Sequence, residues 1–228
     1  MMDQELTLPE PVERLDLGIA RETMRHRDRP AVRALSAFGK LSDQPPLLAA
    51  AAAMAAAGWL RGDRRLVRRG AHVFAAVVLA TVMKDGLKRA VARTRPTRLE
   101  ERGQHEMRLG GPDSKAWTSF PSGHAAGAAA MAGALTRCWP EARWPAVAAA
   151  AALALSRVPK GSHYPTDVLA GVAVGMVASA LAGRLLPPHG GSGGEDGGEG
   201  ERSGVAGADR VGYDCPHRPL AHRWQSGR

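Results

Sequence analysis

The stretch Thr118–Leu135, "TSFPSGHAAGAAAMAGAL", begins as a polar turn and continues as an alanine-rich apolar run. Proline is favoured as the first residue of a helix, because the N–H group at that position makes no hydrogen bond within the helix and its loss costs nothing. Pro121 is the candidate for that position. The N–H groups of Ser122, Gly123 and His124 then lie in the first turn, where a helix binds anions. Ordinary capping of an apolar helix explains the turn about as well, but a neutral cap has no need of His124. We therefore predict an apolar helix with an anion-binding N-terminus.

Five apolar runs of this kind fill the middle of the chain. The mean hydropathy of −0.23 is that of a soluble protein, but it averages these runs with charged ends. A bilayer core needs about 20 apolar residues, or about 17 at the short end, so the shorter runs rely on Arg, Lys and Trp at their ends. Small residues in every run permit close helix packing, which favours a membrane bundle over a soluble bundle of buried helices. The runs are Pro45–Leu60, Ala71–Met83, Gly123–Trp139, Trp144–Leu155 and Val168–Leu186.

The sequence thus predicts three parts. Residues 45–186 form an all-α fold, an integral membrane helical bundle of about five transmembrane helices. Residues 1–44 are charged and contain no apolar region of a cleavable signal, but their apolar residues near the end recur at helical spacing. This pattern predicts an amphipathic helix that lies on the membrane interface or docks on the protein itself. Residues 187–228 are rich in Gly and Arg, and we expect disorder there. The recurring residues are Ala31, Ala34, Leu35, Phe38 and Leu41.

The charge indicates an anionic partner. The net charge is +9, carried mostly by Arg, which suits phosphate. The chain shows no zinc-finger spacing, basic zipper or aromatic-studded basic strand, and its aromatic content is 4%, so we expect membrane lipids and no nucleic acid as partners. Cys138 and Cys215 give no disulfide framework and are expected to be free thiols. Cys215 with His217 and His222 is a weak metal motif, and we predict no metal site.

Loop charges indicate the topology. The loop Arg61–Gly70, "RGDRRLVRRG", carries five arginines, and the positive-inside rule places it in the cytoplasm. Counting spans from it, the loops Met83–Phe120 and Arg157–Asp167 lie together on the outer side. The loop Met83–Phe120 is itself basic, which weakens this assignment of the outer side unless some of its cations belong to an active site.

A second polar motif lies at the end of another apolar run. Lys88 and Arg95 lie seven residues apart, which is two helical turns and predicts that both project from one helix face. Pro96 disfavours helix at Arg95 and marks the exit. Taken alone, two cations at a membrane boundary are best explained as an anchor for lipid headgroups.

The third motif combines Arg157, His163 and Asp167. Because Pro165 starts the last apolar helix, His163 lies just before the helix and Asp167 in its first turn. The helix dipole favours an aspartate there, so Asp167 alone is explained by capping. Beside a histidine, however, a carboxylate that accepts one imidazole proton fixes the tautomer and leaves the other nitrogen free to attack.

Together the three motifs bring cations, two histidines, an aspartate and a helix N-terminus to one side of the bundle. Arginine binds phosphate bidentately, and positioned cations stabilise charge on a transferring phosphoryl group. One histidine can act as nucleophile and the other as general acid. The combination predicts a metal-free site for phosphoryl transfer.

The three motifs resemble, at every fixed position, the three-part signature of the type 2 phosphatidic acid phosphatase (PAP2) superfamily. The resemblance spans about Leu47–Leu186 and rests on the spacing within each motif. The common membrane members of that family have one span more than the five runs seen here. The matching residues are Lys88 and Arg95-Pro96, then Pro121-Ser122-Gly123-His124, then Ser156-Arg157, His163 and Asp167.

The resemblance implies a role for each residue and a PAP2/haloperoxidase-like core. His163 attacks phosphorus to give a phosphohistidine intermediate, and Asp167 orients and charges its ring. His124 protonates the leaving oxygen. No metal or other cofactor is implied. The phosphate oxygens are bound by Lys88, Arg95, Ser122, Gly123 and Arg157.

We therefore expect a membrane phosphatase acting on a lipid phosphate or diphosphate at the outer face of a bacterial-type inner membrane. Phosphatidic acid, phosphatidylglycerophosphate and polyprenyl diphosphate are candidate substrates, and the segment Thr97–Thr118 is the expected place of headgroup selection. A lipid phosphotransferase, a vanadate-dependent haloperoxidase and a lipid-binding scaffold with an unused site remain as alternatives. Extraction from membranes only by detergent would exclude the haloperoxidase, which is a soluble protein.

Overall fold

A computed structural model of the chain describes residues 8–103, 105–110, 114 and 116–188. The chain divides after Gly191, and all of the described residues belong to the first of the two units. Of residues 187–228, for which we predict disorder, only the first two are described, so that prediction lies almost wholly outside the described part.

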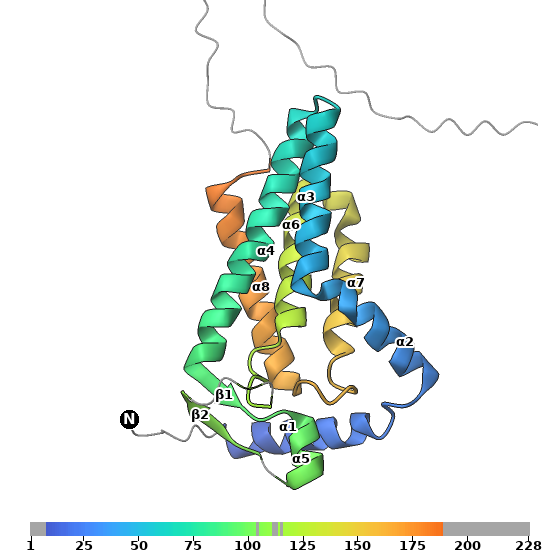
Figure 1. The fold of residues 1–228 in the computed structure, drawn as a ribbon, viewed down its shortest axis with the longest axis vertical. Helices are drawn as coiled ribbons and strands as arrows, with labels where there is room; N and C mark the ends of the chain where they lie inside the picture. Colours follow the sequence, from blue (N-terminus) through green and yellow to red (C-terminus); the bar gives the residue numbers. More distant parts are fainter. Residues whose placement is uncertain (1–7, 104, 111–113, 115, 189–228) are drawn as a thin grey trace, which may run out of the picture. The chain divides into compact units, whose positions relative to one another are not determined.

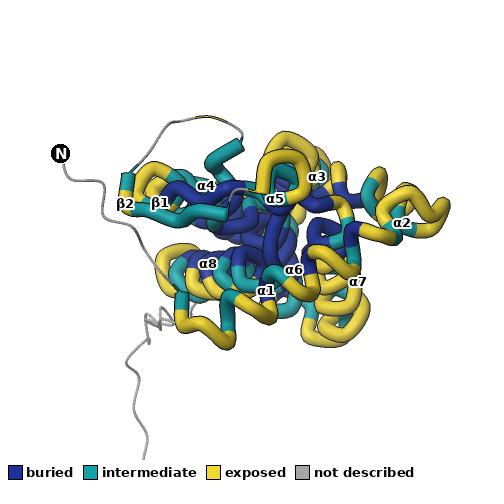
Figure 2. The backbone as a smooth tube through the Cα atoms, turned by 90° about the horizontal axis from the view of Figure 1, so that it is seen from below, coloured by how far each residue is buried: buried dark blue, intermediate teal, exposed yellow. Residues whose placement is uncertain are grey.

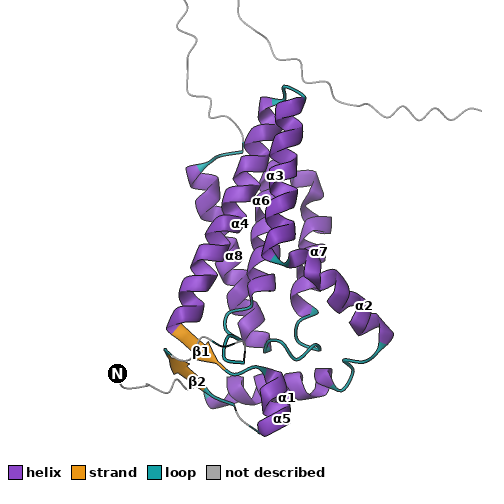
Figure 3. Ribbon diagram, viewed as in Figure 1, coloured by secondary structure: helices purple, strands orange, loops and turns teal. Residues whose placement is uncertain are grey.

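The described part is a helical bundle, as the sequence predicts, and its five main helices coincide with the five apolar runs (Figures 1 and 3). Helix α6 packs against α4, α7 and α8, and α3 packs against α4. Most residues of α6 are buried, those of α8 are buried along one side and exposed along the other, and those of α2 and α7 are mostly exposed (Figure 2). The helices are α3 (Gln44–Leu60), α4 (Arg64–Ala90), α6 (Gly123–Cys138), α7 (Arg143–Leu155) and α8 (Pro165–Leu185).

Helix α4 is longer than its apolar run at both ends. It begins at Arg64 because the Asp63 carboxylate caps it, accepting hydrogen bonds from the N–H groups of Arg65 (2.9 Å) and Leu66 (3.0 Å). Most of the predicted cytoplasmic loop is therefore helical. At the other end α4 continues past Met83 to Ala90. This extension carries Lys88 to the site end of the bundle.

Two of these helices are long and apolar enough to cross a membrane within the described residues. They are α4, with 27 residues, and α8, with 21. Helices α3, α6 and α7 have 17, 16 and 13 residues, shorter than or at the lower limit of a bilayer span. The number of about five transmembrane helices remains a prediction.

Smaller elements surround the site end of the bundle. The predicted amphipathic helix is α2, which packs against α7; Phe38 at its end is 63% exposed, and Leu41 just after it is 57% exposed. The sequence did not predict α1 or the two-stranded antiparallel sheet, in which Val91 pairs with Leu109 and Arg93 with Met107. These elements are α1 (Glu10–Met24), α2 (Pro30–Phe38), η1 (Gly39–Ser42), β1 (Val91–Arg93), α5 (Pro96–Arg102), β2 (Met107–Leu109) and η2 (Pro140–Ala142).

Glycines allow α6 and α8 to approach closely. A Cβ added at Gly171 would lie 2.4 Å from the Ser122 carbonyl oxygen, and one at Gly175 would lie 2.3 Å from the Ala126 carbonyl oxygen. Both distances are far below van der Waals contact, and the backbone atoms concerned cannot move away as the end of a flexible side chain could. The small residues that the sequence shows in these runs are therefore required for packing.

We expect Gly175→Ala to lower the stability of the protein by about 1–3 kcal/mol or more, because the new methyl group forces the two helices apart. The control is Gly86→Ala on α4, where an added Cβ meets nothing within 4 Å. That change should leave stability unaltered or raise it by up to about 1 kcal/mol. Thermal unfolding in detergent measures both, and equal stability of the two variants would contradict the packing argument.

Candidate active site

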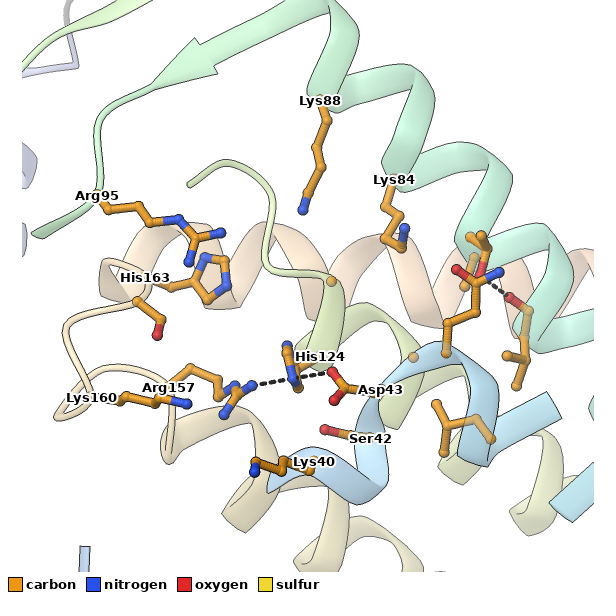
Figure 4. A pocket seen from close by; sticks show the side chains of 18 residues that line it. Lys40, Ser42, Asp43, Lys84, Lys88, Arg95, His124, Arg157, Lys160 and His163 are labelled. Carbon is orange, nitrogen blue, oxygen red and sulfur yellow. Dashed lines mark hydrogen bonds and ion pairs between the residues drawn. The ribbon is translucent and has the colours of Figure 1, made fainter. Parts of the chain in front are cut away.

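Lys88 and Arg95 reach the site from different elements. Helix α4 ends at Ala90, and Val91 is extended (φ −127°, ψ 116°) because it enters strand β1. Arg95 precedes Pro96 and is also extended (φ −78°, ψ 153°), as expected before a proline. The prediction that Lys88 and Arg95 share one helix face is therefore wrong, since a strand separates them. Their side chains nonetheless converge from two directions (Figure 4).

A cavity of about 460 Å³ collects most of the predicted site residues (Figure 4). It lies between the end of α4, the start of α6, the loop from α7 to α8 and the segment that joins η1 to α3. Ser122 and Asp167 do not line it and are fully buried. The predicted residues that do line it are Lys88, Arg95, Gly123, His124, Arg157 and His163.

His163 is held as a neutral imidazole. Its side chain is 3% exposed, and Nδ1 lies 2.7 Å from the Ser119 carbonyl oxygen. Because a carbonyl only accepts hydrogen bonds, Nδ1 carries the proton and Nε2 carries the lone pair. Burial, with the charges of Arg95 and Lys88, lowers the pKa of His163 well below its ordinary value. The ring is therefore neutral at neutral pH, and its Nε2 lone pair is available for attack, as a nucleophile requires.

The hydrogen bonds of the Asp167 carboxylate, within the described residues, go to groups other than the His163 ring, so its link to that ring passes through Ser119. The carboxylate accepts hydrogen bonds from Ser119 Oγ (2.6 Å), the Tyr164 N–H (2.9 Å) and Arg93 (2.7 Å). Ser119 thus joins the two residues, because its hydroxyl donates to Asp167 and its carbonyl accepts from His163. The capping function predicted for Asp167 alone is also present, at the start of α8.

Arg93 is a buried residue of the site that the sequence analysis missed. It is 0% exposed and pairs with Asp167 and, at 2.8 Å, with Asp16 of α1. Its guanidinium also lies 4.2 Å from the centre of the Tyr164 ring. Burial by itself lowers the pKa of Arg93, but the two carboxylates outweigh it and the net shift is upward. A signal was present in α1, where Asp16 shares a four-residue spacing with the buried Ala20 and Met24.

The start of α6 differs in detail from the prediction. Helix α6 begins at Gly123 with Ser122 as its N-cap, so Pro121 precedes the cap instead of forming the first turn. The Ser122 N–H donates to the Asp167 carbonyl oxygen (2.9 Å), and Ser122 Oγ accepts from the Ala125 N–H (3.4 Å). The Ser122 N–H, which was predicted to lie in an anion-binding first turn, thus makes its hydrogen bond within the protein.

Gly123 makes room for the lysines of α4. A Cβ at Gly123 would lie 3.3 Å from Lys84 Cδ and 3.9 Å from Lys88 Nζ. Lys84 was not predicted, although it lies one helical turn before Lys88 and therefore on the same face of α4. Two lysines consequently lie over the open end of α6, where the helix attracts anions.

The guanidinium groups of the cavity have unused donors. Arg157 is 4% exposed and contacts His124 Nε2 through Nη2. Its Nε and Nη1, and Nε of Arg95, are buried without a hydrogen-bond partner among the described residues. Unpaired buried donors are costly, so their presence indicates a ligand that accepts hydrogen bonds.

The N-terminal segment supplies part of the lining. Lys40 and Asp43 line the cavity, together with Lys160 of the loop between α7 and α8 (Figure 4). Asp43 Oδ1 lies 2.5 Å from His124 Nε2. None of these three residues was predicted. Nothing in the sequence pattern before α3 indicates that residues 39–44 return to the motifs.

The fold and the cavity define a helical bundle with a histidine- and arginine-lined anion site at one end. The profile of the PAP2 superfamily matches residues 69–189, just over half of the chain, and the chain belongs to that superfamily.

Two curated relatives carry the name lipid A 1-phosphatase. The one from Rhizobium johnstonii is 38% identical over 112 residues, which are 49% of this chain and 46% of the relative. The one from Rhizobium etli is 38% identical over 114 residues, 49% of this chain and 48% of the relative. The chain therefore spans about half the length of the curated relatives it matches.

Two solved structures share the fold. The crystal structure of Aquifex aeolicus LpxE has a TM-score of 0.58 at 22% identity, over 75% of this chain and 95% of that chain. A transmembrane PAP2 type phosphatidylglycerolphosphate phosphatase from Bacillus subtilis has a TM-score of 0.56 at 22% identity, over 78% of this chain and 87% of that chain. At this identity the likeness concerns the fold alone.

Proposed function

We propose that the protein is a membrane phosphatase that hydrolyses a lipid phosphate or diphosphate through a phosphohistidine intermediate. The observation that carries the proposal is one cavity that contains both a neutral, buried His163 and the unpartnered N–H groups of Arg95 and Arg157. A nucleophile beside unfilled guanidinium donors suits attack on a bound phosphate.

In the proposed reaction the phosphate oxygens accept hydrogen bonds from Lys88, Arg95 and Arg157. The lone pair of His163 Nε2 forms a bond to phosphorus while the bond from phosphorus to the leaving oxygen breaks. A proton from His124 neutralises that oxygen, and the lipid alcohol, or the lipid monophosphate when the substrate is a diphosphate, departs. Water, losing a proton to His124, then displaces the histidine and releases inorganic phosphate. The cations stabilise the charge that spreads over the transferring group.

For the substrate we propose a lipid phosphate at the membrane surface. The names of the two relatives make a glycolipid 1-phosphate such as that of lipid A the first candidate, before phosphatidic acid, phosphatidylglycerophosphate and polyprenyl diphosphate. Helices α4 and α8 are proposed to cross the membrane. The cavity then opens near the outer face of a bacterial inner membrane, with α2 on the interface.

The test is phosphate release from these four lipids by purified protein in detergent, with excess chelator. We expect turnover of at least one lipid, unchanged by the chelator. Arg157→Met should lower it by about 10²-fold or more, because a donor to the transferring group is lost. Arg143→Met, which removes an arginine stacked on Trp144 away from the cavity, is the matched control and should leave activity unchanged. No turnover of any lipid, or loss of turnover with chelator, would contradict the proposal.

A further inference from the structure

Residues 39–44 close one side of the cavity. A Cβ at Gly39 would lie 3.0 Å from Arg157 Nη1, and a Cβ at Gly127 of α6 would lie 3.4 Å from the Ser42 carbonyl oxygen. Ser42 is 2% exposed, and its hydroxyl donates to the Gly39 carbonyl oxygen (2.7 Å). The segment is thus packed against α6 and Arg157, and its turn is fixed by internal bonding.

The carboxylate of Asp43 is turned toward His124 instead of its own helix. Asp43 is the N-cap residue of α3, a position where aspartate usually accepts a hydrogen bond from the first turn. Here its side chain makes no capping hydrogen bond, and Oδ1 lies 2.5 Å from His124 Nε2. The side chain is therefore placed for His124 and contributes nothing to the cap of α3.

His124 is otherwise surrounded by positive charge. Arg157 contacts it from the loop between α7 and α8, which also supplies Lys160. Helix α4 supplies Lys88 and Lys84, of which Lys84 pairs with Asp85, while η1 supplies Lys40 and Arg95 lies across the cavity. Among the described residues that line the cavity, Asp43 is the one carboxylate. Cations oppose protonation of an imidazole, whereas a carboxylate in contact favours it.

We propose that Asp43 is a positioning residue that opposes the surrounding cations and favours the protonated form of His124 when the substrate phosphate is bound, ready to donate to the leaving oxygen. This inference rests on the proposed phosphatase function. The imidazolium has two N–H groups, so one can remain on the Asp43 carboxylate while the other gives its proton to the leaving oxygen. Arg157, which donates only, cannot share Nε2–H with Asp43. When Arg157 binds phosphate, the Nε2–H of His124 can therefore donate to the Asp43 carboxylate.

The test compares Asp43→Asn with wild type in the pH profile of phosphate release from a lipid phosphate. We expect the alkaline limb of kcat to move to lower pH by about one unit, with roughly tenfold lower kcat above the limb and little loss below it. Asp43→Ser should behave in the same way. Asp43→Glu should restore the wild-type limb, and Asp28→Asn, at an exposed carboxylate, is the matched control.

A substrate with a better leaving group provides a second readout. An aryl phosphate needs less protonation of its leaving oxygen, so Asp43→Asn should reduce its turnover less than that of the lipid. A loss that is the same at every pH and for both substrates would show a structural role and overturn the inference, as would an unshifted alkaline limb. Wild-type protein that hydrolyses neither substrate contradicts the phosphatase function itself, and this inference with it.

Discussion

Replacing His163 with alanine is expected to lower phosphate release from a lipid phosphate by at least about 10³-fold, because the group that attacks phosphorus is lost. The other residues of the cavity remain, so substrate binding should change far less than kcat. The variant should also fail to retain labelled phosphate when turnover of a labelled substrate is quenched in denaturant at alkaline pH, where phosphohistidine survives.

The matched control is His26→Ala, in the turn between α1 and α2 and outside the cavity. It should keep wild-type activity and wild-type labelling. Thermal unfolding should show that His163→Ala is folded, since within the described residues its ring is held by one hydrogen bond, to the Ser119 carbonyl. Activity of His163→Ala within tenfold of wild type would refute the assignment of the nucleophile.

Replacing Arg93 with methionine is expected to have the largest effect on stability. The change leaves the carboxylates of Asp16 and Asp167 buried, at 1% and 0% exposure, without their shared cation. Breaking a buried ion pair by removing one partner costs about 3–5 kcal/mol. For a protein of this size the midpoint of thermal unfolding should fall by about 10 °C. Activity should fall too, because Asp167 and Ser119 support His163.

A double variant separates charge from packing. Adding Asp16→Asn to Arg93→Met removes one of the two stranded charges, so the two changes together should cost less than the sum of the single effects. Arg25→Met, which breaks an exposed pair with Glu22, should cost no more than about 1 kcal/mol. If Arg93→Met unfolds at the same temperature as Arg25→Met, the buried network does not support the fold.

The N-terminal segment links these predictions. Asp16 and Asp43 both lie before residue 69, where the match to the superfamily begins, yet both carboxylates reach the site. Asp16 neutralises Arg93 behind the cavity, and Asp43 contacts His124 inside it. Removal of residues 8–44 would therefore leave the signature residues in place but take away two of their charge partners.

The sequence by itself determined the helical bundle and six of the residues that line the cavity. Small apolar residues define the helices, and local signals such as Pro165 at the start of α8 or the Asp63 cap of α4 fix where they begin, because these effects act within a few residues of the chain. The fixed spacing of three motifs was enough to predict that Lys88, Arg157 and His163 share a site.

Only the tertiary structure decided which groups partner the site residues. A hydrogen-bond partner depends on which distant segments pack together: Ser119 to His163 spans 44 positions, and Asp16 to Arg93 spans 77. The local pattern favoured Asp167 as the partner of His163, because both lie at the start of one helix. In the folded protein Asp167 instead accepts hydrogen bonds from Arg93 of β1 and from Ser119 in the loop before α6. Burial is the other property that only the tertiary structure decided. Desolvation keeps His163 neutral, and no sequence pattern reports it.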